Sequence, residues 1–190
     1  MDILFQELAK KYRTPKQIQS FINTFNYNHE SDGPTQKSAM MTLKTGIAHC
    51  MEGALLAAAI MEHHLHPPLF LSLESVDKLD HLVFLFRENG RWGTIGKSRE
   101  LGLGGRAPVF RSVRDLAWSY VDPYVDETGR IKGYQVIDIS NIQYDWRFSK
   151  KNLWALEQHF IQFPHNKLKA SQKRYERVLK NPPSPQEFWW

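Results

Sequence analysis

One continuous apolar segment constrains this chain more than any other feature. From Ala54 to Met61 no side chain is polar, and shortly before this segment stands Cys50, the only cysteine among the 190 residues. A helix that is apolar all round must be packed against other elements on most sides. The pattern therefore predicts a buried helix that begins near Cys50 and around which the rest of the chain folds.

The place of Cys50 at the start of this helix favours a reactive thiol. The first N–H groups of a helix have no partner within it and carry a partial positive charge, which stabilises a thiolate. With a neighbouring imidazolium, the pKa of such a cysteine can fall from about 8.5 to roughly 3.5–7.5. The alternative interpretation is a small buried hydrophobic residue without chemistry.

Length and composition indicate one domain. A chain of 190 residues suffices for one core, and 42% hydrophobic residues are typical of globular proteins. We expect a single domain over 1–181 and a Pro-rich, aromatic tail over 182–190. No apolar run reaches the roughly 18 residues of a membrane span, and no signal peptide is apparent. We therefore expect a cytoplasmic protein without a membrane partner, as a single free thiol also suggests.

Charge and histidine content indicate neither a nucleic-acid partner nor a cofactor. The net charge of +5 permits contact with nucleic acid, but the basic residues are spread along the chain. His63 and His66 are three positions apart, yet no carboxylate or cysteine stands at ligand spacing. We interpret them as a polar helix end, and we expect no metal and no cofactor. The sequence does not indicate an oligomeric state.

Further helices and a long loop surround the central pattern. Capping and amphipathic patterns predict helices near residues 2–12, 15–25, 113–122, 150–162 and 171–180. The first of these helices is expected to bury Ile3, Leu4 and Leu8, and Ser149 is expected to cap the fourth. The glycine-rich segment 97–111 is expected to be a loop. Its Arg106 can bind an anion, although surface solubility is the simpler account.

A β-hairpin carries the second residue of chemical interest. Asn89-Gly90 between two strand-like runs is a strong signal for a hairpin with a type I′ turn. Such a turn sets a register in which Glu88 faces Arg91 and His81 faces Ser98. His81 then opens a strand about thirty residues after Cys50. A nucleophile and a base need hydrogen-bond reach and a third group that orients the base.

These parts, in this order, resemble the transglutaminase-like superfamily, relatives of papain-type thiol enzymes. The matching segments are Ala48–Leu55, Asp80–Phe84 and Gly90–Gly93, while 73–75 and 96–99 resemble an uncharacterised bacterial group within the superfamily. The resemblance implies an α+β fold in which the cysteine helix packs on an antiparallel sheet and further helices surround it. It also implies a Cys50–His81 dyad that transfers an acyl group through a thioester.

One position departs from the superfamily pattern. The pattern has an aspartate about four residues after the return-strand tryptophan, Trp92, where this chain has Gly96. An aspartate that orients the base is worth several orders of magnitude in related triads. Ser98 is expected to hold His81 instead, with Asp80, Asp138 and Asp145 as further candidates. The oxyanion donors would be the Cys50 N–H and a side-chain amide of Gln17, Gln19 or Gln36.

Two functional hypotheses follow, and the sequence leaves open whether the chain is an enzyme. The leading one is a cysteine-dependent acyl-transfer enzyme with Cys50, His81 and Ser98 as catalytic residues. It would hydrolyse or transamidate an amide or peptide bond in a protein, a peptide or a small amide. The alternative is a catalytically inactive transglutaminase-like module that binds or scaffolds a partner.

Overall fold

Helix α4 (Cys50–Met61) is the buried centre of the computed structural model, which describes residues 3–100 and 102–184. Every side chain from Met51 to Met61 is buried. Gly46, at φ 68°, ends the preceding helix α3 (Ala39–Thr45), and His49 enters α4 in an extended conformation. The predicted buried helix is confirmed, and it begins at Cys50 itself.

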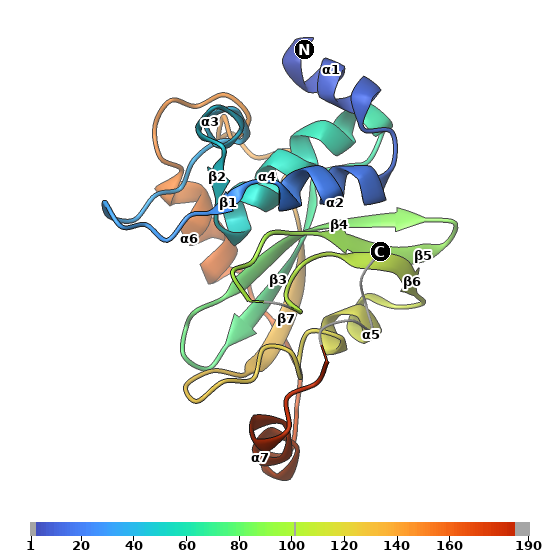
Figure 1. Ribbon diagram of the computed structural model, residues 1–190, viewed down its shortest axis with the longest axis vertical. Helices are drawn as coiled ribbons and strands as arrows, with labels where there is room; N and C mark the ends of the chain where they lie inside the picture. Colours follow the sequence, from blue (N-terminus) through green and yellow to red (C-terminus); the bar gives the residue numbers. More distant parts are fainter. Residues whose placement is uncertain (1–2, 101, 185–190) are drawn as a thin grey trace.

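A six-stranded antiparallel sheet lies against α4 (Figure 1). Its strand order is β6-β5-β4-β3-β7-β8, and every neighbouring pair is antiparallel. The strands are β3 (Leu69–Ser75), β4 (His81–Glu88), β5 (Arg91–Ile95), β6 (Arg106–Phe110), β7 (Ile131–Asp138) and β8 (Asn166–Lys167). Along β4, Phe84 and Phe86 share a hydrophobic cluster with α4, whereas Val83 and Leu85 belong to a cluster on the opposite face.

Helices cover both faces of this sheet (Figure 1). The helices that pack with α4 are α1 (Ile3–Lys11), α2 (Pro15–Asn23), α3 and α6 (Trp154–Gln162). Helix α5 (Val113–Trp118) covers the other face, and an Arg174–Asp122 ion pair ties α7 (Gln172–Lys180) to the segment after α5. The short 3₁₀ helix η1 (Glu62–His64) follows α4. The expected α+β fold is confirmed.

The hairpin between β4 and β5 has the predicted turn and register. Asn89 and Gly90 have φ angles of 49° and 77°, as a type I′ turn requires. Glu88 pairs with Arg91, so the pairing starts as expected. Turn chemistry alone therefore fixed which side chains share a face of these strands.

A parallel two-stranded ribbon leads the chain into α4. Strand β1 (Asn26–Tyr27) pairs with β2 (Ile47–Ala48), and the N–H of Asn28 donates to the Ala48 carbonyl at 3.1 Å. This pairing places the segment 28–37 beside the first turn of α4. The polar residues of that segment consequently lie close to Cys50.

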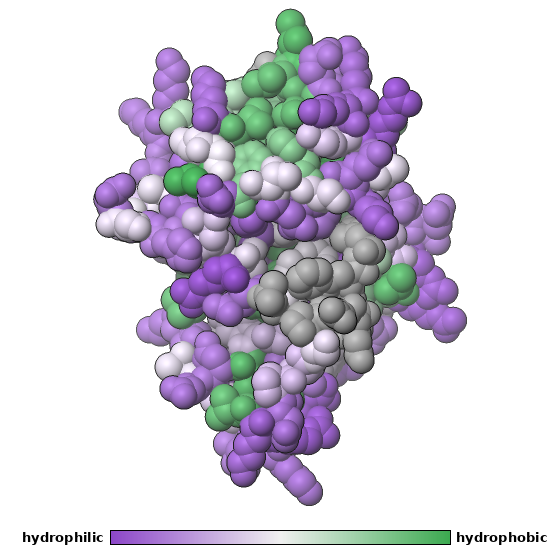
Figure 2. All heavy atoms as spheres, viewed as in Figure 1, coloured by the Kyte–Doolittle hydropathy of each residue, from purple (hydrophilic) through white to green (hydrophobic). Residues whose placement is uncertain are grey.

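Three predicted details are wrong. Helix α1 buries Phe5 and Ala9 and packs Leu8 against the core, while Ile3 and Leu4 are 72% and 43% exposed, so the inward face is rotated from the predicted one. In Figure 2 hydrophobic colour gathers at the end of the molecule where α1 lies. Helix α6 begins at Trp154 because Ser149 caps only a local turn, accepting from the N–H of Lys151. Strand β6 occupies part of the predicted loop 97–111.

Two further expectations concern membrane-spanning helices and the C-terminal tail. Among the helices that the structure describes, none is long and apolar enough to cross a bilayer. Of the predicted tail 182–190, residues 182–184 are exposed without regular structure, and Phe188, Trp189 and Trp190 lie outside the described residues. The division into a domain and a tail stays a prediction.

Candidate active site

Cys50 is the first residue of α4, and its half-buried thiol meets two imidazoles. His49 and His81 both interact with the Cys50 sulfur in a way that lowers the pKa of the thiol. Burial opposes the thiolate, but these interactions and the charges of both histidines lower the pKa of Cys50 well below its ordinary value. The sulfur is therefore held in its nucleophilic form.

His81 reaches Cys50 from the first position of β4, where it is only 5% exposed. Its Nε2 lies 2.7 Å from the carbonyl oxygen of Leu103. A carbonyl oxygen only accepts, so Nε2 carries the hydrogen and Nδ1 is left for the sulfur. The structure thus brings together the two predicted residues, with an acceptor behind the ring.

Ser98 does not take the place opposite His81 that the register suggests. Pairing between β4 and β5 ends at Phe84 and Ile95, so it does not extend as far as His81. The Ser98 hydroxyl accepts a hydrogen bond from the N–H of Glu100 at 3.1 Å. The oxygen that orients the histidine ring is a backbone carbonyl, and a catalytic role for Ser98 stays a prediction.

A buried arginine holds the loop that carries the Leu103 carbonyl. Arg106, at the start of β6, is 0% exposed, and its guanidinium donates to the carbonyls of Gly102 and Gly104 at 2.5 and 3.0 Å. The same group lies 3.9 Å over the ring centre of Tyr120. The interpretation of Arg106 as a surface residue for solubility is wrong, because its donors satisfy the carbonyls of the turn before it.

The sequence analysis gave no role to His49, the second imidazole at the sulfur. Its Nε2 lies 2.9 Å from the Thr35 carbonyl, 3.5 Å from Oε1 of Glu52 and 4.0 Å from Oε1 of Glu30. Burial favours the neutral ring, but the Cys50 sulfur, the Glu52 carboxylate and the Thr35 carbonyl raise the pKa of His49 to about 9. These neighbours therefore favour the charged form of the His49 ring.

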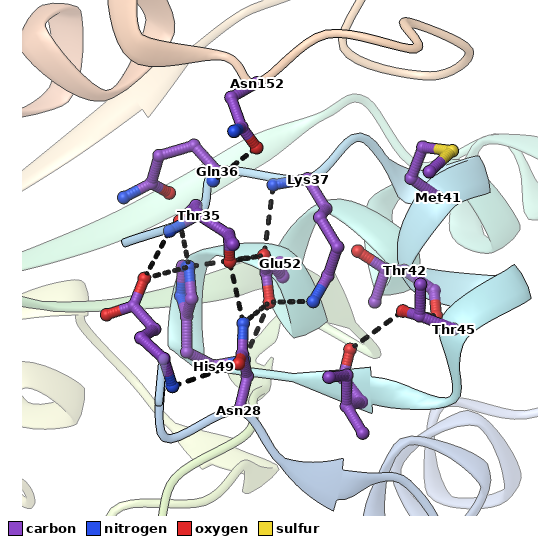
Figure 3. A network of polar contacts seen from close by, with 12 residues as sticks. Asn28, Thr35, Gln36, Lys37, Met41, Thr42, Thr45, His49, Glu52 and Asn152 are labelled. Carbon is purple, nitrogen blue, oxygen red and sulfur yellow. Dashed lines mark hydrogen bonds and ion pairs between the residues drawn. The ribbon is translucent and has the colours of Figure 1, made fainter. Parts of the chain in front are cut away.

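Glu52, in the first turn of α4, is a fully buried carboxylate surrounded by donors (Figure 3). It accepts hydrogen bonds from the backbone N–H groups of His49 and Lys37 and from the side chains of Asn28 and Thr35, at 2.9–3.1 Å. The Lys37 ammonium lies 3.3 Å away. Burial raises the pKa of Glu52, but the charge of His49 and the hydrogen bonds lower it overall. Glu52 thus ties the segment 28–37 to the start of the cysteine helix.

Two further ionisable groups respond to the charge of Cys50. Burial, followed by that charge, raises the pKa of Tyr27 to about 12, which keeps a phenol O–H available as a donor. Burial also raises the pKa of Glu157, whose carboxylate accepts a hydrogen bond from the Gln36 amide at 2.5 Å. A hydroxyl and a carboxyl group therefore interact electrostatically with Cys50 in addition to the two imidazoles.

Gly96, where the resemblance places an aspartate, has no room for a side chain. A Cβ there would lie 2.5 Å from Cγ1 of Val83. The amide of Gln19 binds both the N–H and the carbonyl of Gly96, each at 2.9 Å. The acceptor behind His81 is therefore the neutral carbonyl of Leu103 and not a carboxylate.

The other predicted candidates are engaged in local contacts. The three aspartates accept from backbone N–H groups of nearby residues: Asp80 from Ser75, Asp138 from Ser140 and Asp145 from Phe148. Gln17 completes the capping box of α2. Within residues 3–100 and 102–184, no cluster of three His, Cys, Asp or Glu side chains could hold a metal.

The sequence analysis did not identify His49, Glu52 or Leu103 as residues of the site. A sequence argument could have identified the first two but not the third. His49 stands next to the cysteine, and Glu52 stands at the third helical position, where a carboxylate caps the backbone. Both positions were open to a sequence argument. Leu103 contributes a backbone carbonyl, for which no side-chain pattern exists.

Comparison with known proteins adds distant structural likenesses. No protein-family model matches the sequence. A solved structure described as a candidate cysteine protease from Cytophaga hutchinsonii aligns at a TM-score of 0.43 and 15% identity, over 79% of this chain and 55% of that one. Two structures of Legionella pneumophila LapG, one of them EGTA-treated, align at a TM-score of 0.38 and 12% identity. They match 86% and 89% of this chain and 76% and 77% of LapG. The chain thus spans about half the length, 55%, of the first of these proteins.

Proposed function

We propose that this chain is a cysteine-dependent acyl-transfer enzyme of the transglutaminase-like type, with Cys50 as nucleophile and His81 as general acid and base. The observation that carries the proposal is the buried His81 ring, held with Nε2 2.7 Å from the Leu103 carbonyl, whose interaction with the Cys50 sulfur lowers the pKa of the thiol. A nucleophile, a base and an orienting acceptor are the minimum set for covalent catalysis by a thiol.

In the first half of the reaction the Cys50 thiolate attacks the carbonyl carbon of an amide. A C–S bond forms, and the negative charge moves to the carbonyl oxygen, where the Cys50 backbone N–H and a nearby donor such as the Tyr27 hydroxyl would stabilise it. His81, whose Nδ1 took the proton of the Cys50 thiol when the thiolate formed, then gives this proton to the amide nitrogen. The C–N bond breaks, the amine leaves and a thioester remains on Cys50.

In the second half, water or an amine attacks the thioester carbonyl. His81 accepts a proton from the attacking group, the C–S bond breaks and the thiolate re-forms. Water gives a carboxylic acid, and an amine gives a new amide. We propose a protein or peptide as the substrate, as the resemblance to the transglutaminase-like superfamily implies, and we propose a bacterial, cytoplasmic setting.

A proteome-derived peptide mixture, with and without a small primary amine, tests the proposal. Wild-type protein should produce new chain ends or amine-modified glutamine side chains, detected by mass spectrometry, and Cys50→Ala should produce neither. The matched control is Ser98→Ala. It tests whether product formation needs Ser98 in addition to Cys50 and His81. A wild-type sample that gives no product and no acyl adduct on Cys50 would contradict the proposal.

The second candidate function is a catalytically inactive binding or scaffolding module of the same fold. The observation that favours it is Gly96, because the position that would carry an aspartate cannot accept a side chain without displacing Val83. Under this hypothesis Cys50→Ser retains the partners of the wild-type protein, and wild-type protein acquires no acyl group from any peptide.

A further inference from the structure

The reactive sulfur has two imidazoles, and the groups behind them differ. Behind His81 stands one neutral carbonyl, that of Leu103, at 2.7 Å. Behind His49 stand the Thr35 carbonyl at 2.9 Å and a fully buried carboxylate, Glu52, at 3.5 Å. A carboxylate stabilises an imidazolium far more than a carbonyl dipole does.

We infer that His49, held by Glu52, is the fixed positive partner of the Cys50 thiolate, which leaves His81 to exchange the proton of the reaction. This assignment of separate roles to His49 and His81 rests on the proposed function. The negative charge that the resemblance places behind His81 would thus act through the other histidine. His49 is a positioning residue in this scheme, because it never transfers its proton to substrate.

The local charges are consistent with a permanent imidazolium at His49. The carboxylates that face it are Glu52, Glu30 at 4.0 Å and, on α6, Glu157. The cation beside them, Lys37, lies 3.3 Å from Glu52 and offsets part of its charge. Two other ionisable groups complete this set. Tyr27 interacts electrostatically with Cys50, and Arg99 interacts electrostatically with Tyr27. Acidic groups therefore dominate on the side of His49 away from the sulfur.

Burial keeps water away from the contact between His49 and Glu52. Glu52 is 0% exposed and His49 is 7% exposed, so water cannot replace either partner. The backbone N–H of His49 also donates to Oε2 of Glu52 at 3.1 Å (Figure 3). One carboxylate consequently fixes both the backbone and the charge of the residue next to the nucleophile.

The test is the rate at which iodoacetamide alkylates Cys50 between pH 4 and 10. Cys50 is the only cysteine, so the rate reports on one thiolate. We expect the midpoint in His49→Gln to rise by at least about one pH unit, which lowers the rate about tenfold at pH values below the wild-type midpoint. Glu52→Gln should shift the midpoint in the same direction. The matched control is His64→Gln, which removes a ring bound to the Tyr12 carbonyl at 3.0 Å and should give the wild-type curve. A His49→Gln curve that overlays the wild-type curve overturns the inference.

A second measurement covers the case in which these variants do not fold. In wild-type protein, the ¹³Cε1 signal of His49 should keep the chemical shift of an imidazolium through pH 8, and its titration should move to lower pH in Cys50→Ala. Titration of His49 near pH 6.5 in the wild-type protein would overturn the inference.

Neither readout needs a substrate, so the two proposals fail separately. A thiolate midpoint that depends on His49 in a protein that forms no acyl adduct contradicts the proposed function alone. Acyl transfer with a thiolate midpoint that ignores His49 contradicts this inference alone.

Discussion

The carbonyl oxygen of Leu103 lies 2.7 Å from Nε2 of His81, so the neighbour that holds the ring is a backbone group. This contact makes the orientation of the general base depend on the shape of a loop. The loop in turn depends on the buried guanidinium of Arg106, which binds the carbonyls of Gly102 and Gly104. Arg106 therefore supports the loop whose carbonyl holds the His81 ring.

Arg106→Ala should weaken both the fold and the site. The substitution leaves buried carbonyls without donors and removes the cation over Tyr120, which should lower the free energy of unfolding by about 3 kcal/mol. Urea denaturation measures this loss. Acyl transfer per folded molecule should fall at least about tenfold, because the Leu103 carbonyl is no longer held. Full activity in folded Arg106→Ala would contradict this account of the loop.

Gly96→Asp should not restore a stronger triad. The new Cβ would lie 2.5 Å from Cγ1 of Val83, and overpacking of this kind costs about 1–3 kcal/mol. We expect a lower melting temperature and no gain in activity. Gly96→Ala is the control, because it introduces the same Cβ without the carboxylate. Increased activity in Gly96→Asp would show that the site accepts an aspartate after all.

Ser98→Ala should leave the alkylation curve of Cys50 close to that of the wild-type protein. The hydroxyl of Ser98 accepts from the N–H of Glu100, and the backbone carbonyl of Leu103 orients His81. A rate within about twofold of wild type at every pH is the expected result. A tenfold loss of the alkylation rate would indicate that Ser98 is a catalytic residue.

The Glu52 carboxylate should make stability depend on acid pH. Burial raises the pKa of Glu52, but His49 and the hydrogen bonds lower it below the value in the unfolded chain. A carboxyl group of this kind contributes stability above about pH 4, and the contribution is lost as the pH falls through the folded-state pKa. Urea denaturation at pH 7 and pH 3.5 should show a smaller difference in Glu52→Gln than in the wild-type protein. An equal difference would contradict the assignment.

The parts of the fold that local chemistry determines could be predicted from the sequence. The apolar run placed α4, the Asn89-Gly90 turn fixed the start of the β4–β5 register, and the capping residues Thr14 and Ser112 precede helices as expected. In each case the cause lies within a few residues of the element.

The parts that long-range contacts determine could not be predicted. Which face of α1 packs inward depends on what α4 offers it, so Ile3 lies outside and Phe5 inside. The burial of Arg106 depends on carbonyls that become available only when the turn before it has formed. Cys50 and His81 could be paired from motif order, whereas the Leu103 carbonyl belongs to the backbone.

The most direct measurement of the central claim is the acylation of Cys50 by p-nitrophenyl acetate in a stopped-flow experiment, followed by mass spectrometry of the intact protein. We predict a burst of nitrophenol that corresponds to one acetyl group per molecule, located on Cys50. His81→Ala should slow turnover of this acyl-enzyme at least about a hundredfold. Turnover that is equally fast in wild type and His81→Ala, or an acetyl group on any other residue, would contradict the account.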